Sequence, residues 1–183
     1  MAILRKIGDR RHEGFWLFGL GNTYLDLGEV NRAIEQFEQA IVVAREIGDR
    51  HNEGIHLGGL GDAYSALGQA ERAIEFYEQA LIICREIGLR PSEGEWLGNL
   101  GTAYLDLGEV QRAIEYYEQA LTIARELGQR SSEGLWLGNL GIAYRILRQV
   151  GQAQQYLERS LTIFEEIESP KAAWVRGLLA EIK

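Results

Sequence analysis

The sequence has 183 residues, of which 46% are hydrophobic and 25% charged, values typical of a globular protein with a buried core. Its formal net charge of -8 argues against nucleic acids and anionic membrane surfaces as partners, since both bind basic faces. A single cysteine excludes an internal disulfide, no apolar run is long enough to span a bilayer, and the first residues do not resemble a signal peptide, so we expect a cytoplasmic protein.

The chain repeats itself with a period of 40 residues. Glycine, tyrosine and alanine each recur at this spacing: Gly21, Gly61, Gly101 and Gly141; Tyr24, Tyr64, Tyr104 and Tyr144; Ala33, Ala73, Ala113 and Ala153. A fixed period of this length is the signature of a stacked repeat architecture. We therefore predict a single array over residues 1–183, with repeats at 11–50, 51–90, 91–130 and 131–170.

The two ends of the chain depart from this frame. Residues 1–10 align with residues 41–50, so we expect them to be the end of a second helix in a truncated repeat. Residues 171–183 follow a Ser-Pro pair and form a short amphipathic pattern, which predicts a helix that caps the last repeat.

Within residues 91–130, apolar residues such as Trp96, Leu100 and Tyr104 follow each other at helical steps. Gly108 ends this stripe, and a second stripe runs from there to Gly128. Each repeat is therefore predicted to be a helical hairpin and the fold to be all-α. Gly101 and Ala113 lie on the facing stripes, where a larger side chain would force the helices apart.

The constant positions resemble those of the tetratricopeptide repeat. That family places Leu-Gly, Tyr, Ala, an aromatic residue and Ala at set offsets, which residues 91–130 supply as follows: Leu100-Gly101, Tyr104, Ala113, Tyr117 and Ala120. The 40-residue form is similar to repeats of Pins/LGN-type scaffolds, kinesin light chains and the sensor arrays of bacterial STAND regulators. HEAT and armadillo repeats have a similar period but lack this set of residues.

This resemblance implies an α-solenoid, a right-handed superhelix of stacked hairpins. It also implies that the first helix of each repeat lines a concave groove that binds partners. The groove positions that carry distinctive side chains here are Phe15, Phe18, Asn22, Asp26, Asp62, Glu95, Asn99, Asp106, Asn139 and Arg145.

The resemblance assigns these groove residues complementary roles. Asparagine can donate to and accept from a peptide backbone at once, Phe15 and Phe18 could anchor an apolar side chain, and the aspartates favour basic side chains. Gly58, Gly98 and Gly138 are expected to keep the groove floor low. The lysines of a clamp for a C-terminal carboxylate are missing from these positions, so we do not expect that chaperone-binding activity.

Catalytic and metal-binding residues are not indicated by the sequence. His12, His51 and His56 do not combine with cysteines or carboxylates at zinc-like spacing, and His56 takes the place held by Trp96 and Trp136. Cys84 aligns with apolar residues and has no visible base beside it. We therefore expect no cofactor, no metal and no enzymatic activity.

The sequence thus predicts a noncatalytic scaffold for protein–protein interaction that binds a peptide or helix of a protein partner in its groove. Two alternatives remain open. One is a C-terminal sensor or self-association module of a larger signalling protein, forming a homo-oligomer through an exposed N-terminal face with Ile3, Leu4 and Ile7. The other is a small-molecule or metal-dependent enzyme, which would show turnover or bound metal.

Overall fold

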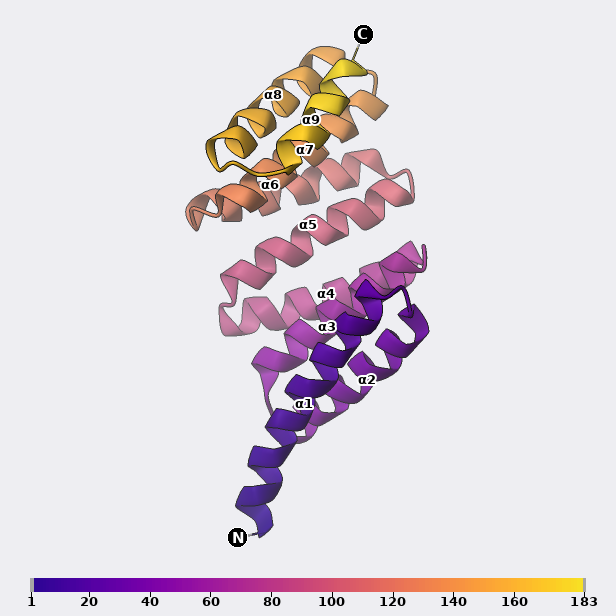
Figure 1. The fold of residues 1–183 in the computed structure, drawn as a ribbon, viewed down its shortest axis with the longest axis vertical. Helices are drawn as coiled ribbons and strands as arrows, with labels where there is room; N and C mark the ends of the chain where they lie inside the picture. The colour runs from indigo at the N-terminus through magenta and orange to yellow at the C-terminus, as the bar shows by residue number, and fades with distance from the viewer. Residues whose placement is uncertain (1, 183) are drawn as a thin grey trace. The chain divides into compact units, whose positions relative to one another are not determined.

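The computed structural model describes the backbone of residues 2–182 and the side-chain surroundings of residues 9–182. This part of the chain holds nine α-helices and no strand (Figure 1), which confirms the all-α prediction. In chain order the helices are α1 (Ala2–Asp26), α2 (Val30–Glu46), α3 (Arg50–Ala66), α4 (Ala70–Ile87), α5 (Arg90–Asp106), α6 (Val110–Glu126), α7 (Arg130–Ile146), α8 (Val150–Glu166) and α9 (Lys171–Ala180).

The helices form two compact units, Met1–Trp96 and Leu97–Lys183, whose boundary falls within α5. In the first unit α1 packs on α2, α2 on α3 and α3 on α4. In the second unit α6 packs on α7, α7 on α8 and α8 on α9. Short turns join these neighbours, so each unit is built from consecutive helical hairpins, as predicted.

The turns between helices depend on a residue with left-handed backbone conformation. At Gly28 φ is +74°, its N–H donates to Leu25 O at 2.9 Å, and the N–H of Glu29 donates to Tyr24 O at 2.8 Å. This pair of bonds is the Schellman motif, which satisfies the last carbonyls of a helix and stops it. The predicted glycine terminators therefore work through their freedom to adopt positive φ.

Two turns reach the same conformation without glycine. Arg148 has φ +60° and Glu168 has φ +52°, and the N–H of Arg148 donates to Arg145 O at 3.0 Å as a glycine would. An L side chain in this region crowds its own backbone, at a cost of about 1–2 kcal/mol. The last repeat thus keeps the fold of the others in spite of local strain.

The start of the chain differs from the predicted arrangement. Residues 1–10 align with a second helix and its turn, yet α1 runs without a break through the position that corresponds to Gly48. Residues 2–10 are therefore part of α1 and do not form the end of a separate helix. The side chains of Ile3, Leu4 and Ile7 lie outside the described residues.

Close packing within each hairpin explains the invariant glycine of the first helix. A Cβ placed on Gly101 would lie 2.7 Å from Cδ1 of Tyr117, and one placed on Gly61 would lie 2.6 Å from Cδ1 of Tyr77. The expected steric reason is confirmed, although the ring of the second helix, rather than Ala113, is the nearest neighbour. Real side chains do not tolerate such contacts, so the hairpin requires glycine here.

At the C-terminal end, α9 lies against α8. Ala172 and Val175 of α9 are buried in one apolar cluster with Leu157 and Phe164 of α8. Because α9 brings its own apolar side to this surface, the rings and branched side chains of α8 are removed from water.

Candidate functional site

The first helix of the first unit carries several of the predicted groove residues on one exposed stripe. Asn22 and Asp26 are exposed, and Phe15 keeps 68% of its surface in contact with solvent. Their spacing of four and seven residues places them on a common side of α1. An apolar ring, an amide and a carboxylate are thus presented together to solvent.

Phe18 is placed differently from its neighbours. Its ring is half-buried and stacks on His56 of α3, with ring centroids 4.9 Å apart, and it also approaches the ring of Phe37 at 5.5 Å. Phe18 is therefore engaged in packing α1 against α3. Its predicted role as a groove anchor is limited to the edge that stays exposed.

The glycines expected to form the groove floor are covered by tryptophans of the following hairpin. A Cβ on Gly58 would lie 2.2 Å from the ring of Trp96, and a Cβ on Gly98 would lie 2.2 Å from the ring of Trp136. The groove-floor interpretation is wrong for these positions, since all of them are buried. Their small size makes room for an indole of the same chain rather than for a partner.

Gly138 extends this pattern to the cap. A Cβ on Gly138 would lie 2.7 Å from Trp174 of α9. The sequence analysis missed Trp174 because it follows Trp136 by 38 residues instead of 40. A search that allowed for a shorter turn before α9 would have found it.

Asp62 also has a partner within its own hairpin. The hydroxyl of Tyr77 on α4 donates to Oδ1 of Asp62 at 2.7 Å. In the next repeat the hydroxyl of Tyr117 approaches Oγ1 of Thr102 at 3.1 Å. Asp62 therefore accepts a hydrogen bond that fixes a buried tyrosine. One of its carboxylate oxygens is thus already used within the hairpin and is less available to basic groups of a partner.

In the second unit, Asn99 and Asn139 are half-buried on α5 and α7, and Asp106 is exposed at the end of α5. Arg145 donates from Nη1 to Oε2 of Glu181 at 2.5 Å, and both residues line a cavity of about 500 Å³ near the end of α7. The only cation predicted for the groove is thus neutralised by a carboxylate at the end of the cap.

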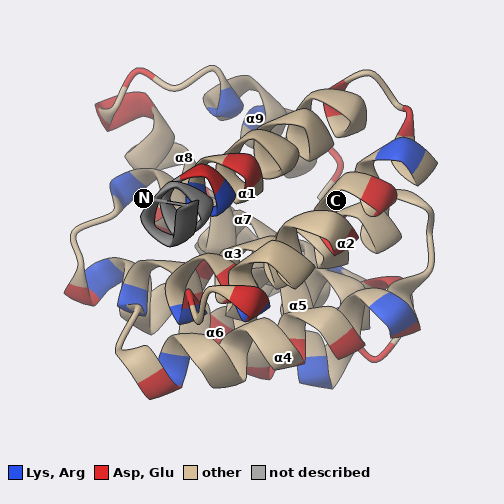
Figure 2. Ribbon diagram, turned by 90° about the horizontal axis from the view of Figure 1, so that it is seen from below, with Lys and Arg blue, Asp and Glu red and all other residues tan. Residues whose placement is uncertain are grey.

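The electrostatics of the predicted site are dominated by acidic groups. Glu95 lies on α5, where surrounding groups partly desolvate its carboxyl and raise its pKa, although the residue as a whole keeps an exposed surface. Asp26 and Asp106 are also exposed on the first helices. Red segments along α4 and α6 in Figure 2 mark carboxylates of the second helices, which lie outside the predicted groove. Six of these glutamates are exposed: Glu35, Glu38, Glu75, Glu78, Glu115 and Glu118. A cationic partner would meet a favourable potential.

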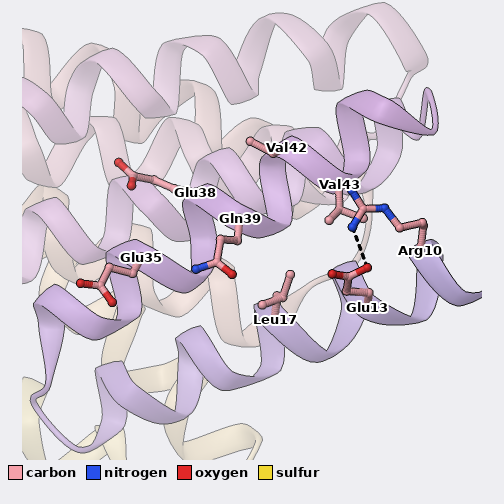
Figure 3. A pocket seen from close by; sticks show the side chains of 8 residues that line it. All are labelled: Arg10, Glu13, Leu17, Glu35, Glu38, Gln39, Val42 and Val43. Carbon is pink, nitrogen blue, oxygen red and sulfur yellow. Dashed lines mark hydrogen bonds and ion pairs between the residues drawn. The ribbon is translucent and has the colours of Figure 1, made fainter.

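A second hollow lies away from the predicted groove residues. A cavity of about 350 Å³ lies between α1 and α2. Glu13 and Leu17 line it on one side and Glu38 and Gln39 on the other (Figure 3). Arg10 donates to Oε2 of Glu13 at 2.7 Å at its rim. None of the ten predicted groove residues lines this cavity, so the sequence analysis did not find it.

Residues with reactive side chains are used in packing. His56 is 3% exposed, and desolvation lowers its pKa below 6.5, while burial raises the pKa of Cys84 to about 11. Within residues 9–182 no group of three metal-binding side chains lies close enough to hold an ion. None of the described helices is long and apolar enough to cross a membrane.

The sequence matches the family model described as "Tetratricopeptide repeat" over residues 14–86, 56–126 and 92–166. No similar sequence is found among curated proteins. Among solved structures, the putative kinesin light chain of Podosopora anserina, with nearly identical TPR-like repeats, is 27% identical at a TM-score of 0.74, covering 91% of this chain and 83% of that one.

Two further structures are similar at lower identity. A Rap protein complexed with Competence and Sporulation Factor is 19% identical at a TM-score of 0.81, over 93% of this chain and 48% of that one. A STAND protein with a tetratricopeptide repeat sensor from Pyrococcus horikoshii is 22% identical at 0.78, over 87% and 25%. The chain therefore spans about half of the first structure and a quarter of the second.

Proposed function

Because the chain belongs to the tetratricopeptide repeat family, we propose that it is a noncatalytic, cytoplasmic scaffold that binds a peptide or helix of a protein partner along its first helices. Proteins of this repeat type generally mediate protein–protein interaction, and one structurally similar protein is a Rap protein complexed with Competence and Sporulation Factor. Recognition then rests on the side chains that the hairpins leave exposed on those helices.

The observation that carries this proposal is the contrast between the two faces of α1. Gly21 is buried against Phe37 and has counterparts of the same kind in every repeat. Phe15, Asn22 and Asp26 are exposed; the first two differ from all their counterparts, and Asp26 shares its residue type with one of its three counterparts only. Packing explains the constant side, but it places no demand on the variable one. A partner of specific chemistry would account for that variation.

The chemistry of the exposed residues favours a basic segment with an apolar side chain. Phe15 and Asn22 offer an apolar surface and a backbone-binding amide, and Asp26 adds a negative charge to a chain whose formal net charge is -8. Affinity for such a segment should decrease with added salt, because exposed charge pairs are screened.

The test is selection of peptides from a random library against the whole protein, followed by affinity measurement on variants. Asn22→Ala with Asp26→Ala should weaken a selected peptide at least tenfold, which corresponds to about 1.4 kcal/mol. Glu75→Ala with Glu78→Ala on α4 is the matched control, since it removes exposed groups outside the first helices. Equal affinity of the selected peptide for the parent and both double variants would reject this function. So would a peptide whose binding is weakened only by the changes on α4.

A further inference from the structure

One side of α1 is exposed although the equivalent side of the first helix is buried in later repeats. Trp16 is 67% exposed, Leu20 is 46% exposed, and the side chain of Glu13 is 47% exposed. Together with the half-buried Leu17 these residues are three and four positions apart and share one face of the helix. We call Glu13, Trp16, Leu17 and Leu20 the N-terminal face.

The same positions are buried in later repeats. In α3 the counterparts Glu53, His56, Leu57 and Leu60 are between 2% and 6% exposed, and in α7 Trp136, Leu137 and Leu140 are at most 5% exposed. The difference between Trp16 and Trp136 therefore comes from their neighbours, since the residue type is the same. Each later copy is covered by the hairpin that precedes it.

These covered copies show what a suitable cover consists of. Trp136 lies over Gly98 of the preceding first helix and stacks on Tyr117 of the preceding second helix, with ring centroids 6.2 Å apart. Trp96 is held in the same way by Gly58 and Tyr77, at 6.1 Å. The cover thus offers a glycine beneath the indole and an aromatic ring beside it.

The third component is an arginine near the end of the covering second helix. Arg45 Nε donates to Glu53 at 2.7 Å, and Arg125 Nε donates to Glu133 at 3.0 Å. Although desolvation opposes it, the arginine hydrogen bonds lower the pKa of the Glu53 carboxyl. Glu13 accepts a hydrogen bond at 2.7 Å from Arg10 of its own helix, as Glu53 does from Arg50, and its carboxylate faces the open cavity between α1 and α2 (Figure 3).

We propose that the N-terminal face is a docking surface for one further helical hairpin of the same 40-residue type. The hairpin would place a glycine beneath Trp16, an aromatic ring beside it, and an arginine in its last turn against Glu13. This inference does not depend on the peptide-binding function, because it uses a different side of α1. It explains why a tryptophan, a leucine and a glutamate are exposed on α1 although the residues at the same positions of α3 are buried.

A second copy of the chain fits this surface less well than a separate hairpin. The only glycine at the C-terminal end of the described repeats that could receive Trp16 is Gly138, and Trp174 of α9 already covers it. Head-to-tail stacking of two copies would first have to displace α9 and expose its apolar cluster with Leu157 and Phe164. The occupant is therefore a hairpin whose glycine is not covered by an indole, as an added copy of residues 91–128 would be.

The experiment joins a copy of residues 91–128 to residues 9–183, so that the junction repeats the Gly-polar-Arg turn found at residues 128–130. Acrylamide quenching of Trp16 is obtained as the difference between each protein and its Trp16→Phe variant. In the joined protein Trp16 should be protected to the level of Trp136, and the unfolding midpoint should rise above that of the original chain.

The matched control is the same joined protein with Gly98→Leu in the added copy only. This change should restore quenching of Trp16, because the indole loses its space. Equal quenching of Trp16 in the original and joined proteins would overturn the proposal. So would a dimer of the original chain, measured by light scattering, that Trp16→Ala converts to monomer, since a second copy would then be the occupant.

Discussion

Phe18 and His56 meet where the first repeat packs on the second. Phe18 is larger than the glycine found at its position in later repeats, and His56 is smaller than the tryptophan found at its position. A glycine lies beneath an indole at Gly58 and Trp96, whereas in the first junction a phenyl ring occupies the glycine position and an imidazole the tryptophan position. We predict that a glycine and a tryptophan can replace Phe18 and His56 only when both substitutions are made together, because each alone should destabilise the protein. His56→Trp alone should cost about 1–3 kcal/mol, because the indole meets the ring of Phe18.

Phe18→Gly alone should also destabilise the protein. Complete removal of a buried phenylalanine side chain costs about 3–5 kcal/mol, so the half-buried ring of Phe18 should contribute about half of that. Glycine within α1 adds about 1 kcal/mol. In the double variant the indole fills the space that the ring leaves, and we expect a favourable coupling of about 0.5–3 kcal/mol.

The assay is a double-mutant cycle from urea unfolding followed by far-ultraviolet circular dichroism. Phe15→Gly serves as the control for Phe18→Gly, because Phe15 lies on the same helix and is 68% exposed. Combined with His56→Trp, the control should give a coupling of zero. If the Phe18 and His56 changes are simply additive, the idea that the two residues exchange volumes is refuted.

Three other predictions concern single positions. Arg148→Gly should stabilise the protein by about 0.5–1 kcal/mol in thermal unfolding, since it relieves the positive φ of +60°, and a decrease in the melting temperature would contradict this. Gly101→Leu should destabilise it by about 1–3 kcal/mol or more through contact with Tyr117; melting at the temperature of the parent would exclude the steric argument. Burial lowers the pKa of His56 below 6.5, so the unfolded chain binds more protons, and stability should decline as pH falls below 6.5. The double variant of Phe18 and His56 should lack this decline, and an identical pH profile would assign it to other groups.

The repeat period was sufficient to predict the hairpins, their turns and the packing role of Gly101. Constant positions in an alignment of repeats are those that the fold itself requires, so the core is visible in one sequence. The left-handed turn at Arg148 could be located in the same way, although its residue type gives no hint of positive φ.

The neighbours of the groove positions could not be predicted from the period. Gly58 was expected to face a partner, but it lies beneath Trp96, because an alignment shows that a residue is small and not which ring covers it. The hydrogen bond from Tyr77 to Asp62 joins two helices at positions 15 residues apart, a distance that no helical periodicity indicates. Side-chain contacts across antiparallel helices require the geometry of the hairpin.

The pairing of large and small residues at the junctions also determines which repeats can be neighbours. Deletion of residues 91–130 as a block would bring Trp136 to Gly58 and preserve the match of an indole with a glycine. Deletion of residues 51–90 would bring Trp96 to Phe18, with two large rings in the space of one. The array should therefore tolerate removal of residues 91–130 better than removal of residues 51–90, because only the first deletion leaves a glycine beneath each indole.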